Sequence, residues 1–230
     1  MKTTSTLLGM LILMLSLTQS VSASSRTLSQ SLKEHSFAKK RSKRGHNEMT
    51  FVIGGGTNFS FISGGGSEGV NGRPHLGLDL GGYLSLPVGK SASIQPGLRF
   101  TQKGAAFTYD IGDGTSSYRF TLHYIEIPVN LCGKAGKGLE YRGGPFLGIL
   151  AGATYRATYD GESFTSGSTD GMRMVEFGLS AGIGYRAENG VGVSLDIVKG
   201  LTNIFEGDPG DSRIPTNNSI RVNLSYSISK

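Results

Sequence analysis

The sequence has little cysteine, no tryptophan and few long apolar runs. Cys132 is the single cysteine in 230 residues, so an internal disulfide is excluded. We expect its side chain to be a small buried group. No segment after residue 23 is apolar over the roughly 20 residues that a transmembrane helix needs, and none keeps a helical period of 3.6. Hydrogen bonding, packing or a bilayer must therefore hold the chain.

Patterns that carry enzymatic chemistry are also missing. The histidines do not follow a metal-ligand spacing such as H-E-x-x-H, and there is no G-x-S-x-G nucleophile motif. They are His35, His46, His75 and His123. Gly-rich stretches such as "GVNGRP" are not followed by a helix that would present its N-terminus to a phosphate. The sequence predicts a protein that is not an enzyme and has no cofactor and no metal.

The first 23 residues are typical of a secretory signal peptide. Lys2 precedes an apolar run at 7–17, and the small residues of "VSA" at 21–23 suit cleavage after Ala23. The alternative, a membrane anchor, needs a longer apolar run. We expect residues 1–23 to direct export.

Positive charge is concentrated in the next segment, 24–48. The formal net charge of the whole chain is +6, and this segment with Lys2 accounts for all of it. Its basic residues are Arg26, Lys33, Lys39, Lys40, Arg41, Lys43 and Arg44. Without apolar periodicity it is expected to be a disordered periplasmic tail, either solvated or in contact with anionic lipid or another acidic partner. Export and the lack of interleaved aromatic residues argue against nucleic acid.

Residues 49–230 alternate between apolar and polar side chains in eight segments. In "VEFGLSAGIGYR", 175–186, the odd positions are apolar or aromatic up to Tyr185 and the even ones are Glu, Gly, Ser or Arg. A period of two is typical of a strand with one apolar face. The predicted strands are 50–62, 75–87, 92–103, 121–133, 139–152, 175–186, 190–201 and 218–228. They are longer than the usual globular strand of about 5–6 residues and long enough to cross a bilayer.

The connections alternate between long and short. Long ones are expected at 63–74, 104–120, 153–171 and 202–217, and short turns at Val88–Ser91, 134–138 and 187–189. In an up-and-down barrel this arrangement gathers the four long loops at one end, as in outer-membrane barrels of Gram-negative bacteria. The sequence predicts an all-β fold over 49–230, an eight-stranded antiparallel up-and-down transmembrane β-barrel in the cell outer membrane.

Periodicity alone does not say which face is outside. A soluble lipocalin-like carrier would put its apolar face inward, whereas an outer-membrane barrel puts it against outer-membrane lipid. Sparse charge favours the membrane, because soluble surfaces are about 25–35% charged. The polar faces carry charges of both signs, which we expect to form a structural network that plugs the narrow lumen. Its predicted members are Asp79, Arg99, Lys103, Glu126, Lys134, Glu140, Arg142, Glu176, Arg186, Asp196 and Arg221.

Several segments, taken in order, resemble the PorT-like outer-membrane protein β-barrel domain family common in Bacteroidota. The most specific are "YIEIP" within 122–131 and "GLTNI" within 177–204, supported by "GGGTNFSF" at 54–61 and "IRVNLSYSI" at 220–228. The resemblance implies an eight-stranded outer-membrane barrel and implies little about activity. The family tends to end at an aromatic residue, whereas this chain continues past Tyr226 to Lys230.

The predicted function is that of a structural or interaction module with a plugged, salt-bridged lumen and four long surface loops. The alternatives are a narrow channel or small-solute transporter and the soluble lipocalin-like carrier. Aromatic residues in two expected loops suit either the binding of a protein or ligand or an interfacial girdle. These are Tyr109, Tyr118, Tyr155, Tyr159 and Phe164. Neither the partner nor the oligomeric state follows from the sequence.

Overall fold

The structure is a computed structural model that describes residues 49–63, 71–111, 114–159, 162–206 and 215–228. The predicted signal peptide at 1–23 and the predicted tail at 24–48 lie outside the described residues. The described residues form nine strands. They are β1 (Thr50–Ser63), β2 (Asn71–Pro87), β3 (Ala92–Ile111), β4 (Gly114–Ala135), β5 (Leu139–Tyr159), β6 (Glu162–Ser166), β7 (Val175–Arg186), β8 (Val191–Gly200) and β9 (Thr216–Ile228).

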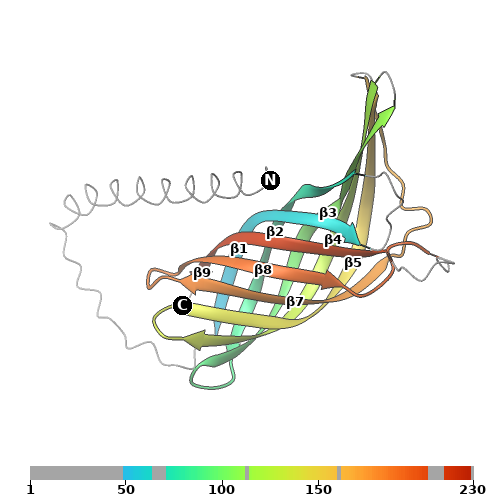
Figure 1. Cartoon of the computed structure of the whole chain (residues 1–230). Helices are drawn as coiled ribbons and strands as arrows, with labels where there is room; N and C mark the ends of the chain where they lie inside the picture. The colour runs from blue at the N-terminus through green and yellow to red at the C-terminus, as the bar shows by residue number, and fades with distance from the viewer. Residues whose placement is uncertain (1–48, 64–70, 112–113, 160–161, 207–214, 229–230) are drawn as a thin grey trace, which may run out of the picture. The chain divides into compact units, whose positions relative to one another are not determined.

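Eight of these strands close into an antiparallel ring (Figure 1). Neighbours in the ring follow one another along the chain, except that β7 follows β5, and β9 returns to pair with β1. β6 lies outside the ring and pairs with β5. Closure gives both edges of each ring strand a hydrogen-bonding neighbour, which a bilayer requires because lipid offers no partner. The predicted eight-stranded barrel is confirmed, with β6 as an addition.

The apolar face of the ring points outward. On β7, Phe177, Leu179 and Ile183 are 55%, 51% and 60% exposed, whereas the neighbouring Glu176 is 3% exposed. Leu224 on β9 is 63% exposed. A soluble lipocalin-like barrel would bury such side chains and expose the charges, so that alternative is wrong. An outward apolar belt around a polar interior is the arrangement that lipid stabilises.

Two of the four segments expected to be long loops are largely strand. Within 104–120, β3 continues to Ile111 and β4 begins at Gly114, and within 153–171, β5 continues to Tyr159 and is followed by β6. These segments are rich in Thr, Tyr and Phe, and such residues favour strands. Their Gly and Ser residues are typical of loops, but pairing with the neighbouring strands prevails.

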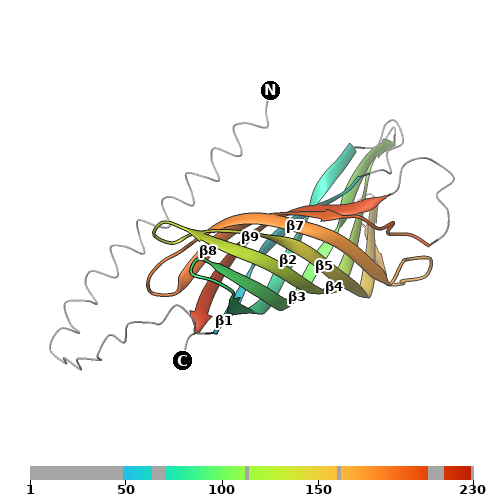
Figure 2. The same ribbon diagram turned by 90° about the horizontal axis from the view of Figure 1, so that it is seen from below.

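The extra strand lengths form an arm beyond the ring, made of residues 71–74, 105–111, 114–120, 153–159 and 162–166. The register runs without a break across it, with Tyr118 opposite both Phe107 and Ala157, and Ala157 opposite Phe164. Figure 1 shows the arm extending upward from the ring, and Figure 2 shows the same strands from below. The arm is thus a five-stranded sheet continuous with the barrel wall.

Irregular backbone marks the junction between the ring and the arm. Gly104 has φ of 142°, and a Cβ atom there would lie 1.9 Å from the carbonyl oxygen of Phe120. The register shifts between Pro74 and Asp79 in β2, and between His123 and Tyr124 where β4 meets β5. Bulges of this kind bend strands and increase their twist. They let the sheet leave the curvature of the ring at this level.

The opposite end of the barrel has the short turns. β2 connects to β3, β4 to β5 and β7 to β8 through a few residues each, as predicted. Gly136, Gly138 and Gly190 in these turns have φ of 58°, 97° and 91°, a left-handed conformation that favours glycine. The long connections and the arm are therefore all at one end, and the tight turns at the other.

Candidate functional site: a buried ion-pair network

Charged side chains meet inside the ring because alternate residues of each strand point inward. Asp79, Glu126 and Lys103 come from β2, β4 and β3, and each is at most 1% exposed. Arg221 from β9 is 5% exposed. Burying an unpaired charge would cost several kcal/mol, so these side chains need partners inside the lumen.

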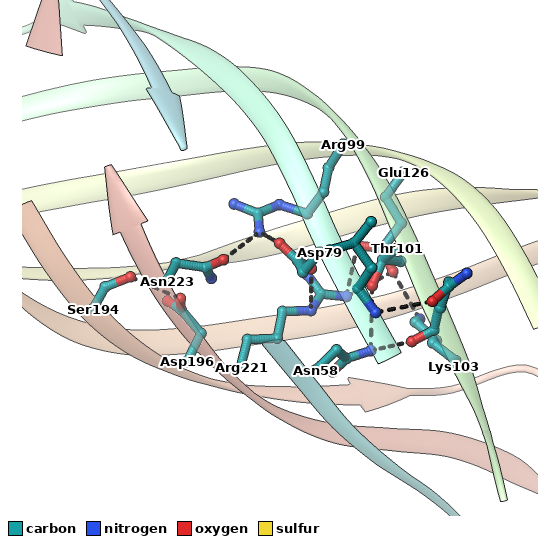
Figure 3. Close-up of polar contacts among 12 residues, drawn as sticks. Asn58, Asp79, Arg99, Thr101, Lys103, Glu126, Ser194, Asp196, Arg221 and Asn223 are labelled. Carbon is teal, nitrogen blue, oxygen red and sulfur yellow. Dashed lines mark hydrogen bonds and ion pairs between the residues drawn. The ribbon is translucent and has the colours of Figure 1, made fainter. Parts of the chain in front are cut away.

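The central part of the network is a continuous chain of ion pairs (Figure 3). Asp79 pairs with both Arg99 and Arg221. Two contacts of 2.8 and 2.7 Å join the Arg221 Nη2 atom to the carboxylate of Glu126. Lys103 Nζ lies 2.7 Å from Glu126 Oε1 and 2.9 Å from Glu176 Oε2. Three cations thus face three anions, which neutralises the cluster and ties five strands together across the lumen.

Two further ion pairs lie beside the central cluster, nearer the short turns. Arg142 donates from Nε and Nη2 to Asp196 at 2.7 and 2.5 Å, and to the Ser194 hydroxyl at 2.6 Å. Arg186 donates to both oxygens of Glu140 at 3.0 and 3.1 Å. Such fork-shaped pairs fix geometry as well as charge. They extend the set of ion pairs toward the end of the barrel that has the short turns.

The structure brings together ten of the eleven residues predicted for the network. Each of the ten has at least one oppositely charged partner within the lumen. They are Asp79, Arg99, Lys103, Glu126, Glu140, Arg142, Glu176, Arg186, Asp196 and Arg221. Lys134 is the exception and corrects the prediction, because it is exposed. It lies one residue before the end of β4, where the lumen opens to water and alternation no longer implies burial.

Uncharged side chains that the sequence analysis did not select complete the network. Asn58 donates from Nδ2 to Thr101 Oγ1 at 3.2 Å and to the Gln102 carbonyl oxygen at 2.8 Å. The Tyr83 hydroxyl accepts from Arg186 at 2.8 Å. The Asn223 Oδ1 atom lies 3.5 Å from Arg99 Nη1. Their inward strand positions were a usable signal, but the prediction considered charges only.

An apolar cluster lies at the arm end of the barrel interior. Its buried members are Leu122, Tyr124, Leu150, Ala153 and Ile204, and Ile62, Phe120 and Met172 pack against it. Ile204 belongs to the connection between β8 and β9. That connection is held by backbone hydrogen bonds from Arg173 to Ile204 at 2.8 Å and from Ile204 to Pro215 at 3.0 Å. We call this group the apolar cap.

Tyr124 joins the apolar cap to the network. Lys103 Nζ lies 5.2 Å from the centre of the Tyr124 ring and 4.6 Å from that of Phe146. Both distances suit an attraction between a cation and an aromatic face. The Asn217 amide donates to the Tyr124 hydroxyl at 3.5 Å. Lys103 therefore contacts two carboxylates and two rings, which leaves little room for water around it.

A cavity of about 30 Å³ lies beside the ion pairs. It is lined by Arg99, Arg142, Asp196 and Arg221 among others and has room for about one or two waters. Among the described residues, no group of three or more His, Cys, Asp or Glu side chains could hold a metal ion. Within the same residues, no helix is long and apolar enough to cross a membrane.

The sequence profile of the family described as outer membrane protein beta-barrel domain matches residues 29–206. The chain belongs to this family. As an outer membrane protein β-barrel, it lies in the outer membrane with its apolar belt in contact with lipid. In barrels of this kind the short turns face the periplasm and the long connections face the cell exterior. The arm and the apolar cap of this family member are therefore on the outer side.

Solved structures of other outer-membrane barrels are similar to this family member. Ail, the attachment invasion locus protein of Yersinia pestis, is 9% identical with a TM-score of 0.42, covering 79% of this chain and 99% of that one. Neisserial surface protein A is 8% identical with a TM-score of 0.43, covering 78% and 97%. OprG from Pseudomonas aeruginosa is 11% identical with a TM-score of 0.32, covering 81% and 99%. Comparison with curated proteins gives no significant match. The assignment rests on the family match.

Proposed function

We propose that this outer-membrane barrel is a closed anchor that holds the arm and the outer connections at the cell surface as a structural or interaction module. The observation that carries the proposal is the set of side-chain contacts that cross the barrel interior. Ion pairs from Arg186–Glu140 to Lys103–Glu176 occupy successive levels of the interior, and the apolar cap lies beyond them toward the arm. A solute crossing the barrel would have to break several of these contacts.

The arm supports an interaction role because aromatic side chains are exposed on it. Tyr159 and Phe164 are 63% and 68% exposed, and Tyr155 is 39% exposed. Exposed aromatic groups on a surface sheet suit contact with a protein or ligand partner. We further propose that the barrel is of the PorT-like type, on the strength of the "YIEIP" and "GLTNI" segments.

The chain ends fit the same orientation. β1 begins at Thr50, which pairs with Ser85 close to the short turn between β2 and β3, and β9 ends beside β1 with Ile228 opposite Phe51. We propose that residues 1–23 direct export and that the basic segment 24–48 extends into the periplasm from this end.

Conductance in planar bilayers tests the closed lumen against the narrow-channel alternative. We expect the refolded protein to give no stable single-channel steps in concentrated salt, because an ion would have to separate the ion pairs and pass the apolar cap. A porin reconstituted in the same bilayers is the positive control. Reproducible steps from protein whose folded state is verified by heat-modifiable migration would overturn the proposal.

A further inference from the structure

The arm has three arginines in one cross-strand row. Backbone register puts Arg73 opposite Ala106, Ala106 opposite Arg119, and Arg119 opposite Arg156. Residues directly opposite in antiparallel strands point to the same side of the sheet, and neighbouring strands are about 4.8 Å apart. All three arginines are exposed. We call Arg73, Arg119 and Arg156 the arginine row.

The arginine row forms no ion pair with any side chain whose position the structure describes. None of the ion pairs among those side chains includes Arg73, Arg119 or Arg156. Arg156 has a contact of 3.4 Å from its Nε to the Thr165 hydroxyl. By contrast, the lumen arginines all have carboxylate partners. Because like charges directly opposite in a sheet destabilise it, the pairing of Arg119 with Arg156 is a cost that an external anion would remove.

All three arginines line a cavity of about 310 Å³. Its walls also include the hydroxyl-bearing residues Thr108, Ser117 and Thr158. Guanidinium and hydroxyl groups are all donors that suit the oxygens of a phosphate. The volume exceeds what a lone phosphate fills and leaves room for part of the molecule that carries it.

The height of the row above the apolar belt indicates where that anion comes from. Arg119 is on the same outward face of β4 as Ile127, Val129 and Leu131, which are 40%, 44% and 60% exposed. Leu131 follows Arg119 by twelve residues. At about 3.3 Å per residue and a strand tilt of about 40°, this corresponds to about 30 Å of height. That is about the thickness of the hydrocarbon core, so the row lies at the level of the outer head groups.

We propose that the arginine row binds the phosphate groups of a phosphorylated glycolipid in the outer leaflet. Arginine recognises phosphate through paired hydrogen bonds as well as charge. The row continues the face that acyl chains cover lower on β4, so a lipid beside the barrel can meet the belt with its chains and the row with its phosphates. The bound lipid would stabilise the arm at the membrane surface.

Binding of lipid A to two charge-matched variants tests this proposal. Arg119→Gln/Arg156→Gln removes two cations from the row, and Lys134→Gln/Lys137→Gln removes two exposed cations at the opposite end. The probe is lipid A added to the folded full-length barrel in detergent, counted by native mass spectrometry. We expect lipid A to bind the row variant about tenfold or more weakly than the unmodified protein, and the lysine variant normally.

Two further ligands identify the chemistry. Lipid A without its phosphates is expected to bind the unmodified protein as weakly as lipid A binds the row variant, and inorganic phosphate at millimolar concentration is expected not to displace lipid A. Equal binding of lipid A by both variants would overturn the proposal, as would full affinity for the dephosphorylated lipid or displacement by free phosphate. If the double variant does not fold, lipid A binding is measured with Arg73→Gln, which removes the cation that β2 contributes to the row. The conductance experiment tests the closed lumen, and its result does not depend on whether the arginine row binds lipid A.

Discussion

Glu126 shows how a single side chain is stabilised inside this barrel. It is 0% exposed and receives charge-assisted contacts from Arg221 on β9 and Lys103 on β3. The carboxylate of Glu126 therefore compensates the positive charge of two buried cations. Because these three side chains are buried, removing one of them leaves its partners buried and uncompensated.

Glu126→Gln is therefore expected to destabilise the folded barrel by about 3–5 kcal/mol. Gln keeps the size of the side chain but not its charge, so the loss reports on electrostatics and not on a cavity. Urea unfolding in lipid vesicles, followed by heat-modifiable migration, measures the free energy of unfolding. Glu162→Gln on β6, where the side chain is exposed, is the matched control and is expected to unfold like the original protein. Identical unfolding curves for the two variants would contradict a stabilising network.

At the scale of elements, the arm depends on the irregular backbone where it leaves the ring. β3 continues from ring to arm through Gly104, whose backbone conformation and close contact with Phe120 both disfavour a side chain. Lys103, the residue before it, belongs to the network. The bend and the network are thus joined along one strand.

Gly104→Ala is expected to destabilise the barrel by about 1–3 kcal/mol, because the added Cβ atom forces the β3 and β4 backbones apart. Gly89→Ala is the control, since a Cβ atom there meets nothing within 4 Å. Urea unfolding of both variants gives the comparison. The proposed role of Gly104 fails if its variant unfolds at the same urea concentration as the Gly89 variant.

At the scale of the whole molecule, the barrel has its apolar side chains on the outside and its charged side chains inside. Leu179 and Leu224 are more than half exposed, whereas Asp79 and Glu126 are fully buried. In water this distribution would be unstable, because burying apolar side chains is the main favourable term in folding. A bilayer supplies that apolar environment from outside and leaves hydrogen bonds and ion pairs to fill the interior.

Spin labels distinguish the two environments. With Cys132→Ala as background, a nitroxide on Leu179→Cys is expected to collide readily with oxygen, which dissolves in lipid, and rarely with a water-soluble nickel complex. A nitroxide on Ser163→Cys, in the exposed strand β6, is expected to show the reverse preference. Electron paramagnetic resonance power saturation measures how often each label collides with oxygen and with the nickel complex. Equal access of the nickel complex to the two labels would contradict the lipid-facing assignment of β7.

The sequence alone was sufficient to predict the ring strands and to divide most of their residues between two opposite faces. The period of two is a local property of the extended backbone, so Glu126 and Leu179 could be assigned to opposite environments without a structure. The arm was missed because Gly and Ser between its aromatic residues look like a loop. Lys134 was misplaced because alternation does not reveal the level at which the lumen opens.

Only the tertiary structure decided which charges meet. Glu126 and Arg221 are far apart in the chain, and their contact depends on how β9 closes against β1 and on the register of each pair in between. The juxtaposition of Arg119 with Arg156 likewise depends on the extra residue in β5 that shifts its register against β4. Alternation is set by neighbouring residues, whereas register and closure are set by the hydrogen-bonded ring as a whole.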